Sequence, residues 1–157
     1  HANLTHGDLD VDGVGEAVRM LRVQADADGR IIGFRPATLV VPAAREAEAR
    51  VLLSSMALAR DLSTDQQPTG NPLAGLNLAL VVEPRLDAAS TADYYVFAPG
   101  SDGAILAAFL DGVMGPRVES QEAPFDRLGM QYRAYMDFGI SLAEHRAAVK
   151  GDVAPYA

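Results

Sequence analysis

The chain has 157 residues, of which 49% are hydrophobic, and its 13 basic and 21 acidic residues give a formal net charge of −8. A chain of this size can bury one sizeable core, while its acidity argues against a surface that neutralises nucleic-acid phosphates. The absence of cysteine excludes disulfides and thiolate sites. No apolar run approaches the roughly 20 residues of a membrane span.

The first predicted element is a helix that begins at Asp12, whose carboxylate can cap it, and ends near Asp28-Gly29. One side of this helix is apolar at helical spacing: Val14, Val18, Leu21 and Ala25. The chain starts at His1 without an initiator methionine and close to this helix, as expected of a fragment that lacks upstream residues, although a tag remnant would also explain His1.

A strand over Thr38–Val41 follows Arg35-Pro36, and Pro42 suits the first position of a second helix that runs to about Arg60. Glu46 and Arg50 are spaced for an ion pair on that helix. Its apolar stripe consists of Ala49, Leu52, Leu53, Met56 and Ala59. The segment from Leu62 to Gly70 lacks periodicity and has the composition of an exposed loop.

The segment Asn71–Asp87 predicts a well-bounded core strand. Its alternation places four large apolar residues on one face: Leu76, Leu78, Leu80 and Val82. The turn Asn71-Pro72 followed by Gly75 precedes the strand, and Pro84 ends it because proline has no amide hydrogen for a ladder. We expect one fully buried and one partly buried face.

Further strands are expected at Tyr94–Ala98 and at Ile105–Leu110, although the alanines of the latter also permit a short helix. From Met130 to Phe138 the alternation predicts a long strand with one wet face. Two helices followed by successive strands indicate an α+β fold with mixed, largely antiparallel sheets.

The acidic segment Asp8, Asp10, Asp12-Gly13 matches the opening of an EF-hand calcium loop. The match then fails, because Arg19 stands where a bidentate glutamate is needed. The more ordinary interpretation is an acidic helix start that interacts favourably with the helix dipole. A calcium-binding module or a small carboxylate-based hydrolase remains the alternative function.

No other pattern supports catalysis, a metal site or a cofactor. Asp137-Phe138-Gly139 resembles the magnesium-binding tripeptide of protein kinases, but the chain has neither a glycine-rich phosphate loop nor a strand lysine. The three histidines, His1, His6 and His145, form no ligand cluster by spacing. The sequence predicts a protein that is not an enzyme.

Seven segments in order resemble the major capsid proteins of tailed bacteriophages with the HK97-like fold, most closely the C-terminal half of Mu-like major head subunits. They are His6-Gly7-Asp8-Leu9, Arg35–Pro42, Asn71–Asp87, Asp93–Ala98, Phe109–Gly112 with Pro116–Ser120, Asp137-Phe138-Gly139 and His145-Arg146. The resemblance covers nearly the whole chain.

The resemblance implies a subunit that self-assembles into pentamers and hexamers of an icosahedral shell enclosing double-stranded DNA. A related container, such as a gene-transfer particle or an encapsulin-like compartment, uses the same fold. The implied domains are a peripheral spine-helix region (1–33), an axial domain (34–110), peripheral return strands (111–145) and a C-terminal segment (146–157). The implied partners are further copies of the chain and other phage head proteins. The resemblance implies neither a membrane nor a specific nucleic-acid sequence as a partner. It places the protein in the host cytoplasm during assembly and in the virion capsid afterwards.

In such shells the axial domains converge at capsomer centres, so the polar loop is expected at a subunit interface. The interface residues so implied are Leu62, Thr64, Asp65, Gln66, Gln67, Pro68 and Asn71. Two family features are expected to be missing. The N-terminal arm and the extended loop, which clasp neighbouring subunits, have no counterpart in this sequence. Some relatives join their subunits by Lys–Asn isopeptide bonds. This chemistry is not expected within this segment, because Lys150 is the only lysine and no asparagine follows Asn77.

Overall fold

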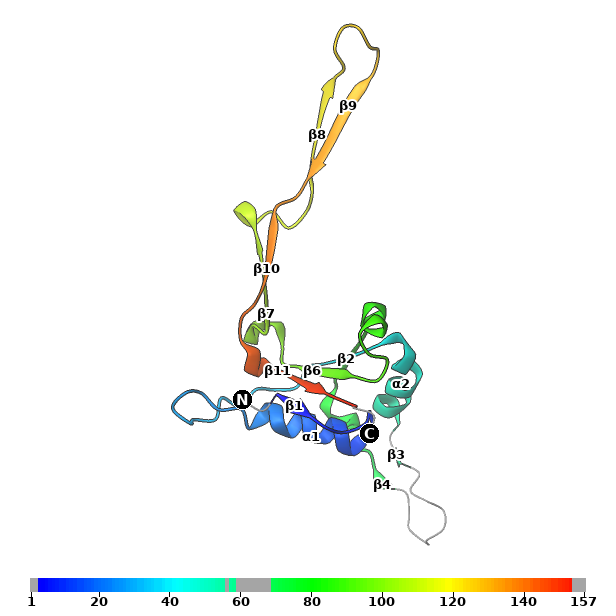
Figure 1. Ribbon diagram of the computed structural model, residues 1–157, viewed down its shortest axis with the longest axis vertical. Coiled ribbons are helices and arrows are strands. Elements are labelled where there is room, and N and C mark those ends of the chain that lie inside the picture. Colours follow the sequence, from blue (N-terminus) through cyan, green and yellow to red (C-terminus); the bar gives the residue numbers. More distant parts are fainter. Residues whose placement is uncertain (1–2, 56, 59–68, 154–157) are drawn as a thin grey trace. The chain divides into compact units, whose positions relative to one another are not determined.

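The computed structural model describes residues 3–55, 57–58 and 69–153, and these form two compact units (Figure 1). The sheet unit comprises residues 1–104 and 144–157, and the hairpin unit comprises residues 105–143. The hairpin unit is therefore an insertion between two segments of the sheet unit. Among the described residues, no helix is long and apolar enough to cross a membrane.

The sheet unit is built on a five-stranded mixed sheet in the order β1-β11-β6-β2-β5. Its strands are β1 (Leu4–Thr5), β2 (Thr38–Val41), β5 (Ala79–Val82), β6 (Tyr94–Phe97) and β11 (Ala148–Gly151). The pairs β1/β11 and β2/β5 are parallel, whereas β11/β6 and β6/β2 are antiparallel. A separate two-residue ladder joins β3 (Ala57–Leu58) to β4 (Thr69–Gly70). The α+β class with mixed sheets is confirmed.

Helix α1 (Val11–Arg22) begins two residues earlier than a cap at Asp12 would allow, because Asp10 is the cap and accepts a hydrogen bond from the Gly13 amide at 2.7 Å. The helix ends at Arg22 and not near Asp28, since the chain then bends into a turn closed by the Ala25–Ile31 bridge. The predicted end near Asp28-Gly29 was therefore wrong by almost two turns.

Helix α2 (Glu46–Ser54) follows a short 3-10 turn, with Pro42 just before that turn. The predicted ion pair is present, with 2.7 Å between Arg50 Nη2 and Glu46 Oε1. The helix ends at Ser54, before the predicted end at Arg60. The 3-10 segments are Ala43–Arg45, Ala74–Leu76, Pro84–Ala88, Gly100–Asp102, Leu110–Gly112 and His145–Ala147.

One hydrophobic core joins α1, α2 and a single face of the sheet. Leu39, Val96 and Val149 lie opposite one another in register across β2, β6 and β11, and all three are fully buried. Alternate residues of these strands, such as Val40 and Tyr95, are only half-buried. The helices therefore pack on the face that carries the larger share of apolar side chains.

The strand predicted within Asn71–Asp87 is shorter and more exposed than expected. Asn77 has a left-handed backbone (φ 50°), so the regular strand begins only at Ala79. Leu78, Leu80 and Val82 pack against the core but are only half-buried, and Val81 on the other face is exposed. The reason is position: β5 is the edge strand of the sheet and has a partner on one side only.

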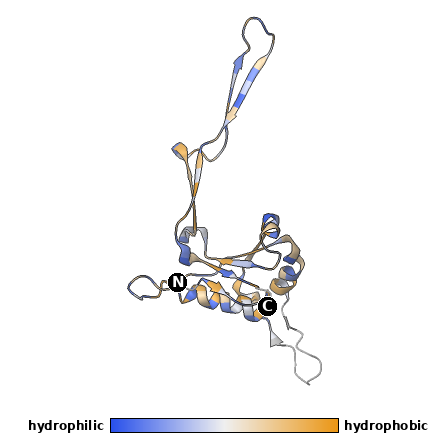
Figure 2. Ribbon diagram, viewed as in Figure 1, coloured by the Kyte–Doolittle hydropathy of each residue, from blue (hydrophilic) through white to orange (hydrophobic). Residues whose placement is uncertain are grey.

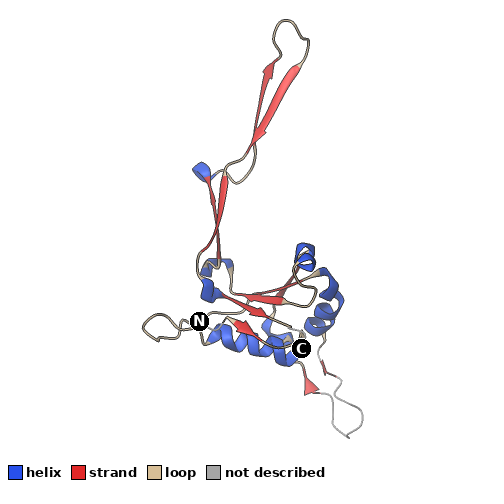
Figure 3. Cartoon of the chain, in the orientation of Figure 1, coloured by secondary structure: helices blue, strands red, loops and turns tan. Residues whose placement is uncertain are grey.

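The hairpin unit consists of two successive antiparallel pairs (Figure 3). The inner pair is β7 (Ile105–Phe109) with β10 (Phe138–Leu142), and the outer pair is β8 (Arg117–Glu122) with β9 (Met130–Tyr135). The long strand predicted from Met130 is thus divided at Met136-Asp137. Alternation in the sequence did not reveal that the two pairs lie on one continuous insertion.

Candidate functional site

The outer pair of the hairpin unit has two chemically different faces. Residues directly opposite in an antiparallel register share a face. One face carries the pairs Arg117/Tyr135, Glu119/Arg133 and Gln121/Gln131, and the other carries Val118/Ala134, Ser120/Tyr132 and Glu122/Met130. The first is polar and the second is mainly apolar, so the pair is amphipathic.

The polar face is held together by its own side chains. Arg133 Nε donates to Glu119 Oε2 at 2.6 Å, the Tyr135 hydroxyl donates to Glu119 Oε1 at 3.1 Å, and Gln121 donates to Gln131 at 3.2 Å. The hydrogen bond from Arg133, followed by that from Tyr135, lowers the pKa of Glu119 below its ordinary value. These contacts satisfy the polar face without any partner.

The apolar face has no covering layer within the described chain. Val118 is 67% exposed, Tyr132 70% and Met130 53%. All six residues of β8 and all six of β9 are exposed. The predicted wet face is therefore present, but the face expected to be buried is open as well.

The inner pair also has an open hydrophobic face, while its other face carries Gly139/Ala108 and Ser141/Leu106. The register places Phe138 against Phe109, Ile140 against Ala107 and Leu142 against Ile105 on one side. The two phenylalanine ring centroids are 6.4 Å apart, whereas Ile140 and Leu142 are mostly exposed. Figure 2 shows hydrophobic residues along both strands of this pair.

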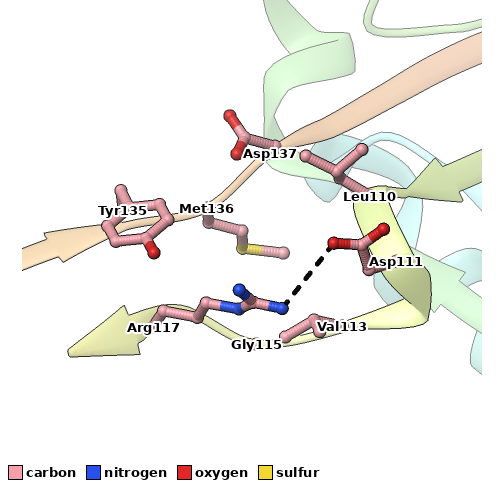
Figure 4. Close-up of a pocket in the computed structure, with 8 residues that line it drawn as sticks. All are labelled: Leu110, Asp111, Val113, Gly115, Arg117, Tyr135, Met136 and Asp137. Carbon is pink, nitrogen blue, oxygen red and sulfur yellow. Dashed lines mark ion pairs between the residues drawn. The ribbon is translucent and has the colours of Figure 1, made fainter. Parts of the chain in front are cut away.

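A pocket of about 250 Å³ lies where the inner and outer pairs meet (Figure 4). Figure 4 shows the Arg117 guanidinium directed toward Asp111, with 3.9 Å between Nη2 and Oδ2, and the side chain of Met136 beside it. Asp111 and Gly112 both have positive φ (55° and 70°), which produces the sharp bend. Asp137, from the kinase-like tripeptide, is another lining residue. The pocket therefore holds one arginine and two carboxylates.

The acidic segment before α1 is occupied by structural contacts. Asp10 caps the helix, and Asp8 accepts from the Leu9 amide at 2.8 Å and lies 3.1 Å from Arg45. Within the described ranges, no group of three or more His, Asp or Glu side chains is placed to hold a metal ion. Of the histidines, His1 lies outside the described residues, and His145 Nδ1 is 3.8 Å from Glu144.

The predicted interface loop lies largely outside the described residues, which include none of Leu62, Thr64, Asp65, Gln66, Gln67 and Pro68. Asn71 is described, and its side chain is 7% exposed. Its amide donates to the Leu52 carbonyl at 2.7 Å and to the Ser55 carbonyl at 2.9 Å, and its side-chain oxygen accepts from the Leu73 amide. Asn71 therefore ties the end of α2 to the following segment.

A family model described as phage capsid protein matches residues 2–151. The chain belongs to the phage capsid protein family. This family consists of structural capsid proteins and not of enzymes. The open apolar faces of the hairpin unit are accordingly surfaces of a protein whose family forms shells.

A search of curated proteins found no match. Among solved structures, the chain is similar to the cryo-EM structure of the holo-SrpI encapsulin complex from Synechococcus elongatus PCC 7942, with 13% sequence identity and a TM-score of 0.48. The match covers 99% of this capsid-family chain and 55% of that chain, so this chain spans about half the length of that protein.

Proposed function

We propose that this chain is a self-associating subunit of an icosahedral phage or prophage head shell with the HK97-like fold. Pentamers and hexamers of such subunits would enclose double-stranded DNA, with other head proteins as further partners. The membership in the phage capsid family supports the general role. The ordered segments of the sequence favour the Mu-like major head subunits as the nearest group.

The observation that carries self-association is the pair of open apolar faces on the hairpin unit. A two-stranded hairpin is marginally stable in water without a packing layer. Burial of six large side chains, at roughly 2 kcal/mol each, would contribute on the order of 10 kcal/mol. They are Val118, Met130, Tyr132, Phe138, Ile140 and Leu142.

This gross gain is similar to the cost of association, about 4–15 kcal/mol. One hairpin contact alone would therefore give weak association, whereas a subunit in a closed shell makes several contacts at once. Permanent contacts typically bury over about 2,000 Å². We infer that assembly is cooperative and that single subunits persist at low concentration.

We also propose that the sheet unit and the hairpin unit together supply the axial and peripheral domains of a capsid subunit. The region 34–110 would lie in the axial domain, and the loop from Leu62 to Pro68 would meet its equivalents at a capsomer centre. Because Asn71 is buried, its part in that interface would be to fix the backbone that leads out of the loop. The net charge of −8 suits a container wall that does not hold its DNA tightly.

The experiment compares two double variants that add the same charge to opposite faces of the outer pair. Val118→Lys/Tyr132→Lys places lysines on the apolar face, and Gln121→Lys/Gln131→Lys places them on the polar face. Light scattering after size exclusion, with negative-stain microscopy, measures assembly. We expect the wild type and the polar-face variant to form oligomers and the apolar-face variant to remain smaller.

Thermal melting of the sheet unit, followed by circular dichroism, is the control for folding, since all four positions are exposed. Equal assembly by both variants would contradict the role of the apolar face. A wild-type chain that stays monomeric at every concentration would contradict the proposed function itself.

A further inference from the structure

An open cleft of about 470 Å³ lies in the sheet unit. Its walls come from the end of α1, from residues 33–36 and from residues 75–76. Phe34, which is 8% exposed, and Leu76 supply apolar wall. Arg22 and Arg35 supply two exposed guanidinium groups. The remaining lining residues are Gly33, Pro36 and Gly75. The cleft is both basic and apolar.

The arginines of this region differ from the other basic side chains of the described chain. Nine basic residues have a carboxylate within 4.0 Å: Arg19, Arg45, Arg50, Arg85, Arg117, Arg127, Arg133, Arg146 and Lys150. Among described residues, only Arg22, Arg30 and Arg35 have no such partner. Arg22 lies in the last turn of α1, where a positive charge interacts favourably with the helix dipole. Arg30 and Arg35 lie outside the helix and have no such interaction.

Two of these arginines, Arg22 and Arg35, line the same cleft, although the chain carries an excess of acids, 21 against 13 basic residues. Exposed apolar residues accompany the three arginines: Val23, Ile31 and Ile32 are 48%, 68% and 40% exposed. The occupant that fits such a surface carries carboxylates and at least one large apolar side chain.

The turn at the tip of the outer hairpin has this composition. Its backbone is closed by hydrogen bonds from the Ala123 amide to the Gly129 carbonyl at 2.9 Å and from the Arg127 amide to the Pro124 carbonyl at 2.8 Å. Phe125 and Leu128 are both fully exposed. A large aromatic side chain presented on a closed turn is a typical anchor for a pocket on a partner.

The acidic side chains of the tip are available for a partner. Glu122 has no basic group within 4.0 Å among the described residues, and Asp126 has only Arg127, at 4.0 Å. By contrast, Glu119, further down the same hairpin, is paired with Arg133. Glu122 is therefore open to a partner. Asp26, Asp28 and other described acids also lack an ion pair, so the tip is distinguished by the combination of this carboxylate with the exposed Phe125.

We propose that the hairpin tip of one copy docks into the Arg22/Arg35 cleft of a second copy. Phe125 enters the cleft, and Glu122 and Asp126 face the two arginines. This inference rests on the proposed self-association and specifies where two subunits join. Because both parts occur in every copy, each subunit offers one tip and one cleft, and the contact is heterologous, of the kind that closes rings.

Charge reversal tests the contact. The tip variant is Glu122→Arg/Asp126→Arg, and the cleft variant is Arg22→Glu/Arg35→Glu. Each alone places like charges against each other, so we expect association at least roughly tenfold weaker than for the wild type. An equimolar mixture brings the reversed tip against the reversed cleft and should restore association in sedimentation velocity measurements.

The matched control is Arg19→Glu/Arg50→Glu, which changes the net charge as the cleft variant does but lies outside the cleft. Mixing it with the tip variant should give no rescue. Rescue by this control, or no rescue by the cleft variant, would overturn the proposal. The proposal would also be overturned if the cleft variant assembled normally but bound a double-stranded DNA oligonucleotide more weakly than the wild type. That result would assign Arg22 and Arg35 to contacts with phosphates.

The same measurements distinguish a failure of the proposed self-association from a failure of the proposed docking contact. A wild-type chain that remains monomeric overturns both proposals before any variant is made. A wild type that assembles while both charge-reversed variants assemble equally well overturns only the docking of tip and cleft.

Discussion

Replacing the two glycines of α1 by alanine should change the stability of the sheet unit in opposite directions. A Cβ atom at Gly13 would lie 2.1 Å from the Asp8 carbonyl oxygen and 3.0 Å from the Tyr94 hydroxyl. A Cβ atom at Gly15 would meet nothing within 4 Å. The two positions are two residues apart, so they face different sides of the helix.

The magnitudes follow from helix propensity and from the clash. Gly15→Ala gains about 1 kcal/mol of helix propensity. Gly13→Ala gains the same amount at most, but the Asp8 backbone must move because contacts shorter than 3.0 Å are essentially never seen for a Cβ atom. Overpacking of this kind costs about 3 kcal/mol, so the net loss is about 2 kcal/mol.

Urea denaturation followed by circular dichroism at 222 nm measures both changes, since α1 and α2 belong to the sheet unit. In thermal melting, 1 kcal/mol corresponds to about 2–4 °C for a chain of this length. We therefore expect the midpoint to rise by about 2–4 °C for Gly15→Ala and to fall by about 4–8 °C for Gly13→Ala. Changes of the same sign would refute the close packing of the Asp8 backbone on α1.

Three further predictions concern the sheet unit. Tyr94→Phe should leave the free energy of unfolding unchanged or raise it by about 1 kcal/mol in urea titrations, because the hydroxyl is buried without a hydrogen-bond partner in the described structure; a clear loss of stability would show that the hydroxyl is satisfied. Lys150→Met should cost about 1 kcal/mol at pH 7, a low value because Lys150 is 34% exposed. Burial alone would raise the pKa of Asp93, but the hydrogen bond and charge of Lys150 outweigh it and lower that pKa; the pair therefore stabilises the fold above the unfolded pKa of about 3.9, and the difference between wild type and variant should shrink as the pH falls below that value. The hydrogen bond that Lys150 donates to Asp93 raises the pKa of Lys150, so the same contribution should also be lost as the pH rises through the raised value; a difference that is constant with pH would exclude the ion pair as its source. Millimolar Ca²⁺ should leave the melting temperature unchanged, because the carboxylates before α1 cap the helix or pair with Arg45; a rise with Ca²⁺ would restore the calcium-binding alternative.

The sequence predicted those elements whose ends are marked by local chemistry. Strand β2 lies where it was expected, because Pro36 and Pro42 restrict the backbone on both sides of it. Strand β6 was also located correctly. By contrast, β1 and β11 were missed, since two and four residues carry too little periodicity, and their pairing joins residues 4–5 to residues 150–151.

The hairpin unit shows a different limit. Alternation in β9 correctly assigned Met130 and Tyr132 to one face and Arg133 to the other. Alternation alone reports that a face is apolar, however, and not which chain covers it. In a shell protein the covering layer can belong to another molecule, so the burial inferred for β9 within one chain was wrong.

The candidate contacts had only a partial signal in the sequence. The tip is acidic and carries Phe125, but nothing local shows that Glu122 lacks a basic partner while Glu119 has one. The isolation of Arg22 and Arg35 from carboxylates is likewise a property of the folded chain. Such contacts become visible only when every ion pair of the tertiary structure is known.

The hairpin unit leaves and re-enters the sheet unit at a single point, where the Glu144 amide donates to the Gly103 carbonyl at 2.9 Å. Strands β6 and β11, which flank the insertion, are already antiparallel neighbours. A short turn in place of residues 105–143 would therefore complete an ordinary β-hairpin, and loop length itself costs little free energy. Residues 105–143 can therefore change in length or chemistry without altering the pairing of β6 with β11 in the core of the sheet unit.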